Sequence, residues 1–202
     1  MSTSIRMRQD QAGNLSGTVY EMHCGPARAE VWPFAGFNCL RWTIDGKNVL
    51  YSAPDWSTNP VPTRSGHPIL FPFPNRLAHG KLNANGIDYQ LPLTEATRTH
   101  AIHGFTARSP WRVVDSGASG GSAFVTACFR MSEQFENAAS LWPSDGSLTL
   151  TYSLSETSLR VEAVVENWAT RICRMVWVIT AIFGRPWPRM RKRSMAGCFN
   201  VK

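Results

Sequence analysis

Two polar side chains, Asn75 and Arg76, directly follow an apolar, proline-rich stretch in the segment HPILFPFPNRL at residues 67–77. Because proline fixes φ and has no N–H to donate, this segment is expected to form a rigid loop or sheet edge rather than a central strand. A rigid loop can present the planar fork of donors of Arg76 to the hydroxyl and ring oxygens of a ligand such as a sugar. An ion pair of Arg76 at a strand end is the alternative interpretation.

A histidine next to a glycine, His103–Gly104, ends a short apolar run in the segment AIHGF at residues 101–105. A glycine at this place lets a ligand or another part of the backbone come close to the imidazole. A lone histidine often has a structural role only, and this alternative stays open for His103. Three other histidines have no motif that supports a functional role and are interpreted as structural: His67, His79 and His100.

The spacing of the five histidines and five cysteines matches no zinc site, and the sequence has no glycine-rich phosphate loop or nucleophile elbow. We therefore expect neither a metal nor a cofactor. The cysteines are interpreted as reduced thiols, which predicts a cytoplasmic protein. No signal peptide or membrane span is expected, because residues 1–14 are polar and the longest apolar stretch, residues 175–183, is too short to cross a bilayer.

The whole chain has a net charge of +7, and its basic residues are concentrated in the last part of the sequence. Residues 1–167 contain 13 Lys and Arg against 14 Asp and Glu, whereas residues 168–202 contain 8 Lys and Arg and no acidic residue. A basic segment of this kind can bind nucleic acid or an anionic lipid surface.

Short segments of alternating apolar and polar residues, separated by Gly, Pro, Asn and Asp, run through most of the chain. Asp45–Gly46 and Asn85–Gly86 are typical of two-residue hairpin turns. One helix or long loop is expected at residues 130–145. The expected strands are residues 27–33, 38–44, 47–52, 81–84, 87–91, 111–115, 123–131, 147–155 and 158–166. This pattern predicts an all-β protein with an antiparallel β-sandwich.

The last two expected strands each place four apolar side chains on one face. These are Leu148, Leu150, Tyr152 and Leu154 in the first strand, and Leu159, Val161, Ala163 and Val165 in the second. The short turn at residues 156–157 predicts that the two strands form an antiparallel pair.

The motifs and their order resemble the aldose 1-epimerase (galactose mutarotase) family over roughly residues 20–167. The matching pieces are, in family order, residues 36–44, PILFPFPNRL, the hairpin GKLNANGIDYQLP at residues 80–92, AIHGF, WRV at residues 111–113, WP at residues 142–143 with SLTLTYSLS, and LRVEAVVEN at residues 159–167. Phe105 stands where mutarotases often have a second glycine, which favours the broader group of epimerase-like proteins.

The resemblance implies a large antiparallel β-sandwich (a galactose mutarotase-like supersandwich) that holds a sugar in a cleft on one sheet. It also implies interconversion of the α and β anomers of an aldose. A glutamate base takes the proton of the anomeric hydroxyl, a histidine acid protonates the ring oxygen, and the ring opens and closes on the other face. By the same resemblance, Arg76 and His103 bind and orient the sugar, and Asn75 supports them. The partner is then a small-molecule sugar, with no metal, nucleotide, nucleic acid or membrane.

The catalytic residues of the family are not identifiable in this chain. In the family the histidine acid follows soon after the strand that ends at Asn167, and the glutamate lies much later; neither phrase is present here. We therefore expect residues 1–167 to form the N-terminal part of a β-sandwich that is incomplete at its C-terminus. Residues 168–202 are expected to form a basic, poorly structured tail.

The genetic code offers an origin for this tail, namely translation out of frame after Asn167. The codons of the other reading frame are obtained by joining the last base of each codon to the first two bases of the next. In that frame Met175–Val176 and Trp177–Val178 each give a glycine codon, and the codon between these two permits leucine. One permitted choice of codons for residues 168–184 reads LGDTDMPYGLGNHRYFR, which contains the histidine phrase of the family. Such a chain would keep the sugar-binding residues and lack epimerase activity.

Two other functions stay open on the sequence alone. A non-catalytic carbohydrate-binding module would keep Arg76 and His103 and would need no acid or base. A nucleic-acid or membrane-surface protein would use the basic residues of segment 168–202.

Overall fold

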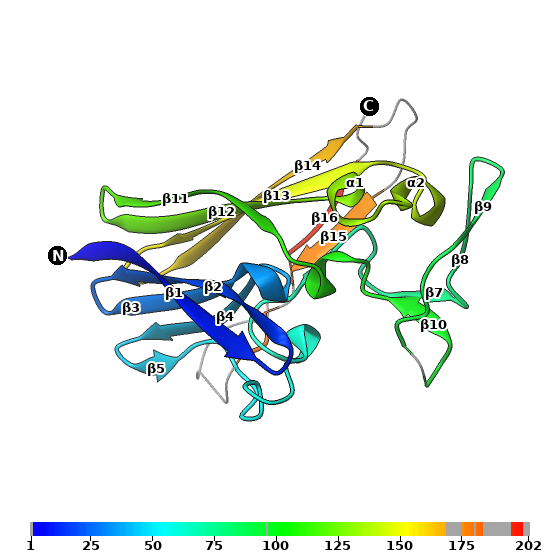
Figure 1. Ribbon diagram of the computed structural model, residues 1–202. Helices are drawn as coiled ribbons and strands as arrows, with labels where there is room; N and C mark the ends of the chain where they lie inside the picture. Colours follow the sequence, from blue (N-terminus) through cyan, green and yellow to red (C-terminus); the bar gives the residue numbers. More distant parts are fainter. Residues whose placement is uncertain (1, 96, 169–174, 180, 184–194, 200–202) are drawn as a thin grey trace.

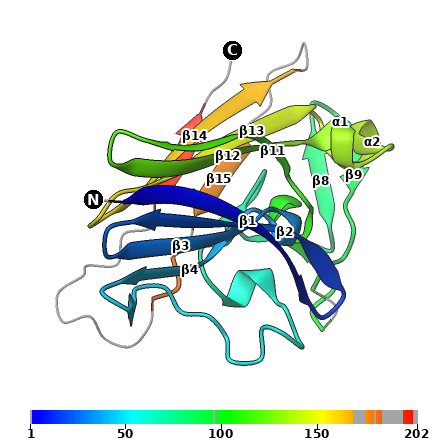
Figure 2. The same cartoon turned by 60° about the vertical axis from the view of Figure 1, so that its left-hand side comes forward.

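The structure is a computed structural model, and it describes residues 2–95, 97–168, 175–179, 181–183 and 195–199. It consists mainly of antiparallel β-strands, which confirms the predicted all-β sandwich (Figure 1). In both views the N-terminal sheet, in blue and cyan, faces a second sheet in green and yellow (Figure 2). The helices are short, and none in the described residues is long and apolar enough to cross a membrane.

The first sheet contains the N-terminal strands in sequence order, each antiparallel to the next. Its strands are β1 (Thr3–Ala12), β2 (Leu15–Cys24), β3 (Ala27–Trp32), β4 (Asn38–Ile44) and β5 (Lys47–Asn48). Asp45 and Gly46 have φ angles of 50° and 73°, the left-handed pair that a two-residue hairpin turn requires, so this predicted hairpin is confirmed. Its second strand is shorter than predicted, because the regular pairing with β4 ends at Asn48.

The hairpin of β1 and β2 is absent from the sequence-based prediction, which has no strand before residue 27. In β2 the buried side chains are Val19, Met22 and Cys24, whose spacing is not a strict alternation. The side chains of β1 are mostly half-buried or exposed. The period of two that identifies a half-buried strand is therefore weak in both strands.

The second sheet has the order β11-β12-β13-β14 and is antiparallel throughout. Its strands are β11 (Arg112–Ser119), β12 (Ser122–Arg130), β13 (Gly146–Leu154) and β14 (Leu159–Asn167). The four apolar side chains predicted on one face of β13 are all fully buried, and those of β14 are half-buried against the same core. These side chains pack with Met22, Ala29 and Val31 of the first sheet, so the main core lies between the two sheets.

The chain between the two sheets forms small strand pairs. These are β7 (Arg76–Ala78) with β10 (His100–Ile102), and β8 (Lys81–Ala84) with β9 (Ile87–Gln90). Asn85 and Gly86, with φ angles of 54° and 77°, confirm the second predicted hairpin. It extends away from the sandwich at the right of Figure 1. The two strand pairs thus lie at one end of the molecule.

Several short elements complete the described structure. Residues 130–145, expected as a helix or long loop, contain α1 (Met131–Gln134) and α2 (Ala138–Leu141). The 3-10 helices are η1 (Pro33–Ala35), η2 (Pro62–Arg64) and η3 (Thr106–Arg108). A further sheet joins β6 (Ile69–Leu70), β15 (Met175–Ile179) and β16 (Met195–Phe199). The expected division at residue 167 stays a prediction, since much of segment 168–202 lies outside the described residues.

Candidate functional site

The backbone brings the two phrases identified in the sequence together at Phe71 and Gly104. The N–H of Phe105 donates to the carbonyl oxygen of Phe71 at 2.8 Å, and Phe71 forms an isolated bridge with Gly104. Gly104 has a φ angle of 64°, and a Cβ atom there would lie 2.0 Å from the Phe71 oxygen. The missing side chain of Gly104 thus lets the backbone at Phe71 come close to the glycine itself.

The His103 side chain is fixed by the proline-rich loop. Its Nδ1 lies 2.9 Å from the carbonyl oxygen of Pro74, and its backbone N–H donates to the carbonyl oxygen of Asn75 at 3.2 Å. Because a carbonyl oxygen only accepts hydrogen bonds, Nδ1 carries the hydrogen in this arrangement. Nε2 is then an acceptor in the neutral ring and a donor in the protonated ring. The half-buried imidazole therefore has one nitrogen that the loop does not use.

Arg76 is the first residue of β7 and lies opposite Ile102 of β10, the residue before His103. Its guanidinium forms a bidentate pair with Glu95, in which Nε donates to Oε2 at 2.6 Å and Nη2 to Oε1 at 2.5 Å. Hydrogen bonding from Arg76 lowers the pKa of the Glu95 carboxyl, against the opposing effect of desolvation. The ion pair foreseen as the alternative for Arg76 is thus present, but it leaves other guanidinium N–H groups unused.

Asn75 connects these two residues. Its backbone carbonyl accepts the N–H of His103, and its exposed side chain makes no hydrogen bond with the described residues. The structure therefore places Asn75, Arg76 and His103 next to one another on two paired segments. Their role in binding a sugar stays a prediction.

Aromatic side chains pack around the loop that carries these residues. Phe73 stacks on Trp142 with 5.5 Å between ring centroids, and Phe105 contacts Phe135 at 5.3 Å and Phe73 at 6.0 Å. Phe73, Phe105 and Trp142 are buried, so their rings support the loop and do not offer an open face to a ligand.

Glu95 is the residue of this site that sequence reasoning missed. It lies in the loop between β9 and β10, and its backbone N–H donates to the carbonyl oxygen of His100 at 3.0 Å. An acidic residue shortly before AIHGF was the available signal. It was not enough, because the partner of a loop carboxylate depends on how the loop folds back.

Of the other histidines considered in the sequence, His67 lies against the core, whereas His79 follows β7 and His100 begins β10. His67 contacts the Tyr152 hydroxyl through Nδ1 at 3.3 Å, and the rings of His79 and His100 lie 5.5 Å apart. Within the described residues, no group of three or more His, Cys, Asp or Glu side chains is placed to hold a metal ion. The segment where the family places its histidine acid lies partly outside the described residues.

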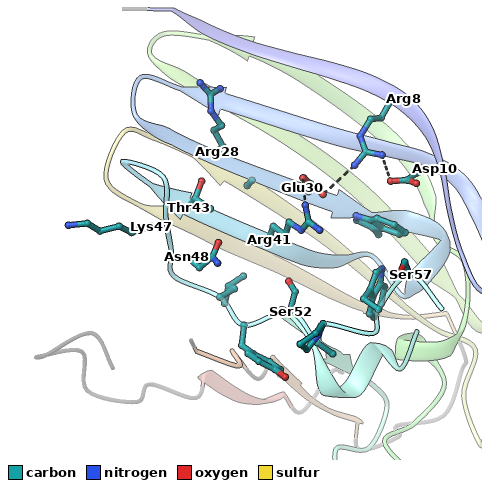
Figure 3. A pocket seen from close by; sticks show the side chains of 17 residues that line it. Arg8, Asp10, Arg28, Glu30, Arg41, Thr43, Lys47, Asn48, Ser52 and Ser57 are labelled. Carbon is teal, nitrogen blue, oxygen red and sulfur yellow. Dashed lines mark hydrogen bonds and ion pairs between the residues drawn. The ribbon is translucent and has the colours of Figure 1, made fainter. Parts of the chain in front are cut away.

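A wide groove of about 1340 Å³ lies on the outer face of the first sheet and is lined by none of the predicted site residues (Figure 3). Its floor comes from β3 and β4, and residues 50–57 form one wall. Several of its charged side chains form ion pairs. Arg8 donates through Nε to Glu21 at 2.5 Å and also pairs with Asp10, and Arg41 lies 3.5 Å from Glu30. No motif in the sequence pointed to this groove.

Comparison with known proteins identifies relatives of one kind. Residues 36–173 match the model of the aldose 1-epimerase family. The matched range includes both segments of the candidate site, residues 67–77 and 101–105. The uncharacterized protein YihR of Escherichia coli K12 is 33% identical over 103 residues, which are 50% of this chain and 30% of YihR.

Solved structures share the fold. A galactose mutarotase-like protein from Clostridium acetobutylicum matches with a TM-score of 0.74 and 21% identity, over 88% of this chain and 54% of that one. A galactose 1-epimerase from Lactobacillus acidophilus matches with a TM-score of 0.63 and 17% identity, over 88% and 52%. The chain therefore spans about half the length of these structures, and less of YihR.

Proposed function

Because the chain belongs to the aldose 1-epimerase family, we propose that Asn75, Arg76 and His103 bind an aldose. The observation that carries this proposal is the pairing of the two segments, which brings three residues of one predicted site together. The free N–H groups of Arg76 would donate to sugar hydroxyls, and Nε2 of His103 would contact a hydroxyl or ring oxygen. The pair with Glu95 fits this role, since it fixes the guanidinium without using all its donors.

The reaction of the family is the interconversion of sugar anomers by a base and an acid on opposite sides of the substrate. We propose that this chain carries the binding part of such a site and does not catalyse the reaction. The support is in the sequence: segment 168–202 contains no histidine and no acidic residue. The same reasoning keeps a non-catalytic carbohydrate-binding module as the second candidate.

We also propose that residues 168–202 are translated out of frame and that the protein is cytoplasmic. The two glycines forced by Met175–Val176 and Trp177–Val178 support the first point. Cys24 and Cys39, which are buried and free, support the second. The coding DNA decides the first: insertion of one base after codon 167 must open a long frame that contains the histidine phrase, and a stop codon soon afterwards would contradict the proposal.

The lack of catalysis is tested by polarimetry on freshly dissolved α-D-galactose and α-D-glucose. The chain of 202 residues is expected to leave the rate of mutarotation at the buffer value. The chain expressed from the frame-restored gene is expected to accelerate it. Acceleration by the 202-residue chain would contradict the proposal and show that its residues suffice for the reaction.

A further inference from the structure

The pair of Arg76 and Glu95 divides the guanidinium into a bound edge and a free edge. Nε and one hydrogen of Nη2 point to the Glu95 carboxylate. Both hydrogens of Nη1 and the second hydrogen of Nη2 are left for other acceptors. The Glu95 side chain is 17% exposed and that of Arg76 is 37% exposed, so the arginine is the more accessible partner of the pair. The N–H groups that Glu95 does not use thus belong to the more accessible side chain.

The backbone around Glu95 is held by the same strand that leads to His103. The Glu95 N–H donates to the His100 carbonyl at 3.0 Å. The neighbouring Thr94 hydroxyl donates to the Ile102 carbonyl at 3.2 Å and accepts the Ile102 N–H at 3.0 Å. The loop around Glu95 is thus fixed to β10, and β10 is paired with β7, which begins with Arg76. Glu95 is part of the same framework as the proposed binding residues.

Two other arginines, Arg98 and Arg108, lie near this pair. The Arg98 Nε lies 4.0 Å from the Glu95 carboxylate, and its side chain is 64% exposed, so water and salt screen its charge. The Arg108 Nη1 donates to the Ile102 carbonyl at 3.3 Å. Among the described residues, the short bidentate contact with the Arg76 guanidinium belongs to Glu95 alone.

We propose that Glu95 is a positioning residue that orients the Arg76 guanidinium and offsets its charge, so that the site takes an uncharged aldose. This inference rests on the proposed function. A guanidinium whose charge is balanced by a carboxylate still donates well to neutral hydroxyls, because its N–H groups keep their polarity. It attracts a phosphate or carboxylate less than an unpaired guanidinium does, because the ligand's charge is then repelled by Glu95.

The test compares D-galactose with D-galactose 6-phosphate in ligand-observed NMR titrations of the full chain at constant ionic strength. Glu95→Gln is expected to weaken galactose binding about tenfold and to shift the ratio of the two affinities about tenfold toward the phosphate. Glu95→Asp keeps the charge and is expected to keep the wild-type ratio even where galactose binds less tightly. Glu133→Gln is the matched control, because Glu133 forms a bidentate pair with Arg112 that shares no residue with the site, and it is expected to change neither affinity.

An unchanged affinity ratio in Glu95→Gln would overturn the role of Glu95 while leaving sugar binding intact. A wild-type chain that prefers the phosphate would overturn the assignment of an uncharged ligand. Failure of the wild-type chain to bind either sugar would contradict the proposed function itself. Unfolding midpoints of the variants, measured alongside, separate a lost fold from a lost contact, and Glu95→Asp keeps the ratio measurable if Glu95→Gln does not fold.

Discussion

His67 shows how a contact with a buried side chain makes stability depend on pH. Its ring lies beside the fully buried Tyr152, and loss of hydration lowers the pKa of His67 to about 4 from the ordinary value of 6.5. The unfolded chain therefore binds more protons than the folded chain between these two values. The free energy of unfolding is expected to be highest above pH 6.5 and to fall as the pH drops toward 4, with no further loss from this group below 4.

The measurement is urea denaturation of the wild-type chain and of His67→Gln at pH 7.5, 5.5 and 4. Carboxylates titrate in the same range, so the difference between the two proteins isolates the histidine. The wild-type chain is expected to lose about 2 kcal/mol more than the variant over this range, a value discounted because the ring is only half-buried. An equal loss of unfolding free energy in the two proteins between pH 7.5 and 4 would contradict this explanation.

Single residues of the site were predictable to different degrees. Asn75, Arg76 and His103 were found from their motifs, and the structure places them together; their binding role stays a prediction. Glu95 was not found, because its contact with Arg76 depends on the fold-back of the loop before β10. The imidazole orientation of His103 was also not predictable, since the acceptor is a main-chain oxygen of another segment.

At the level of elements, the contact between Gly104 and Phe71 decides whether the two site segments can meet. Gly104→Ala would place a Cβ atom 2.0 Å from a backbone oxygen in a residue with φ of 64°. The variant is expected to lose about 3 kcal/mol or more in the free energy of unfolding, from the left-handed backbone together with the clash.

The matched control is Gly86→Ala, where φ is 77° and no atom lies within 4 Å of the added Cβ. This variant forces alanine into a left-handed backbone without a clash, and it is expected to lose about 1 kcal/mol in the free energy of unfolding. Urea denaturation of both variants measures the difference. Equal losses in the two variants would mean that the close approach at Phe71 does not exist in solution.

Elements with strong local signals were predicted well. The turns at residues 45–46 and 85–86 were found because their dipeptides favour left-handed backbone. Strand β13 was found because apolar and polar residues alternate from Leu148 to Leu154. The hairpin of β1 and β2 was missed because its half-buried side chains follow no clear period. Its position is set by packing against the second sheet, which the local sequence does not contain.

At the scale of the whole molecule, the chain corresponds to about half of its solved relatives in length. The described part contains a two-sheet core and the paired segments of the proposed binding site. The family's acid and base are expected in sequence beyond Asn167, where this chain has no candidate of either type. The fold class was therefore predictable from strand patterns and family motifs. The reading frame of residues 168–202 is decided by the coding DNA.

The central claim is that Arg76 holds an aldose in a site shared with His103. The most direct measurement is the dissociation constant of D-galactose for the wild-type chain, Arg76→Ala and Arg112→Ala, obtained by ligand-observed NMR. We predict saturable binding that weakens at least about tenfold in Arg76→Ala and is unchanged in Arg112→Ala, which removes an arginine paired with Glu133 and with no residue of the site. Absence of saturable binding to the wild-type chain, or equal binding by wild type and Arg76→Ala, would contradict the account.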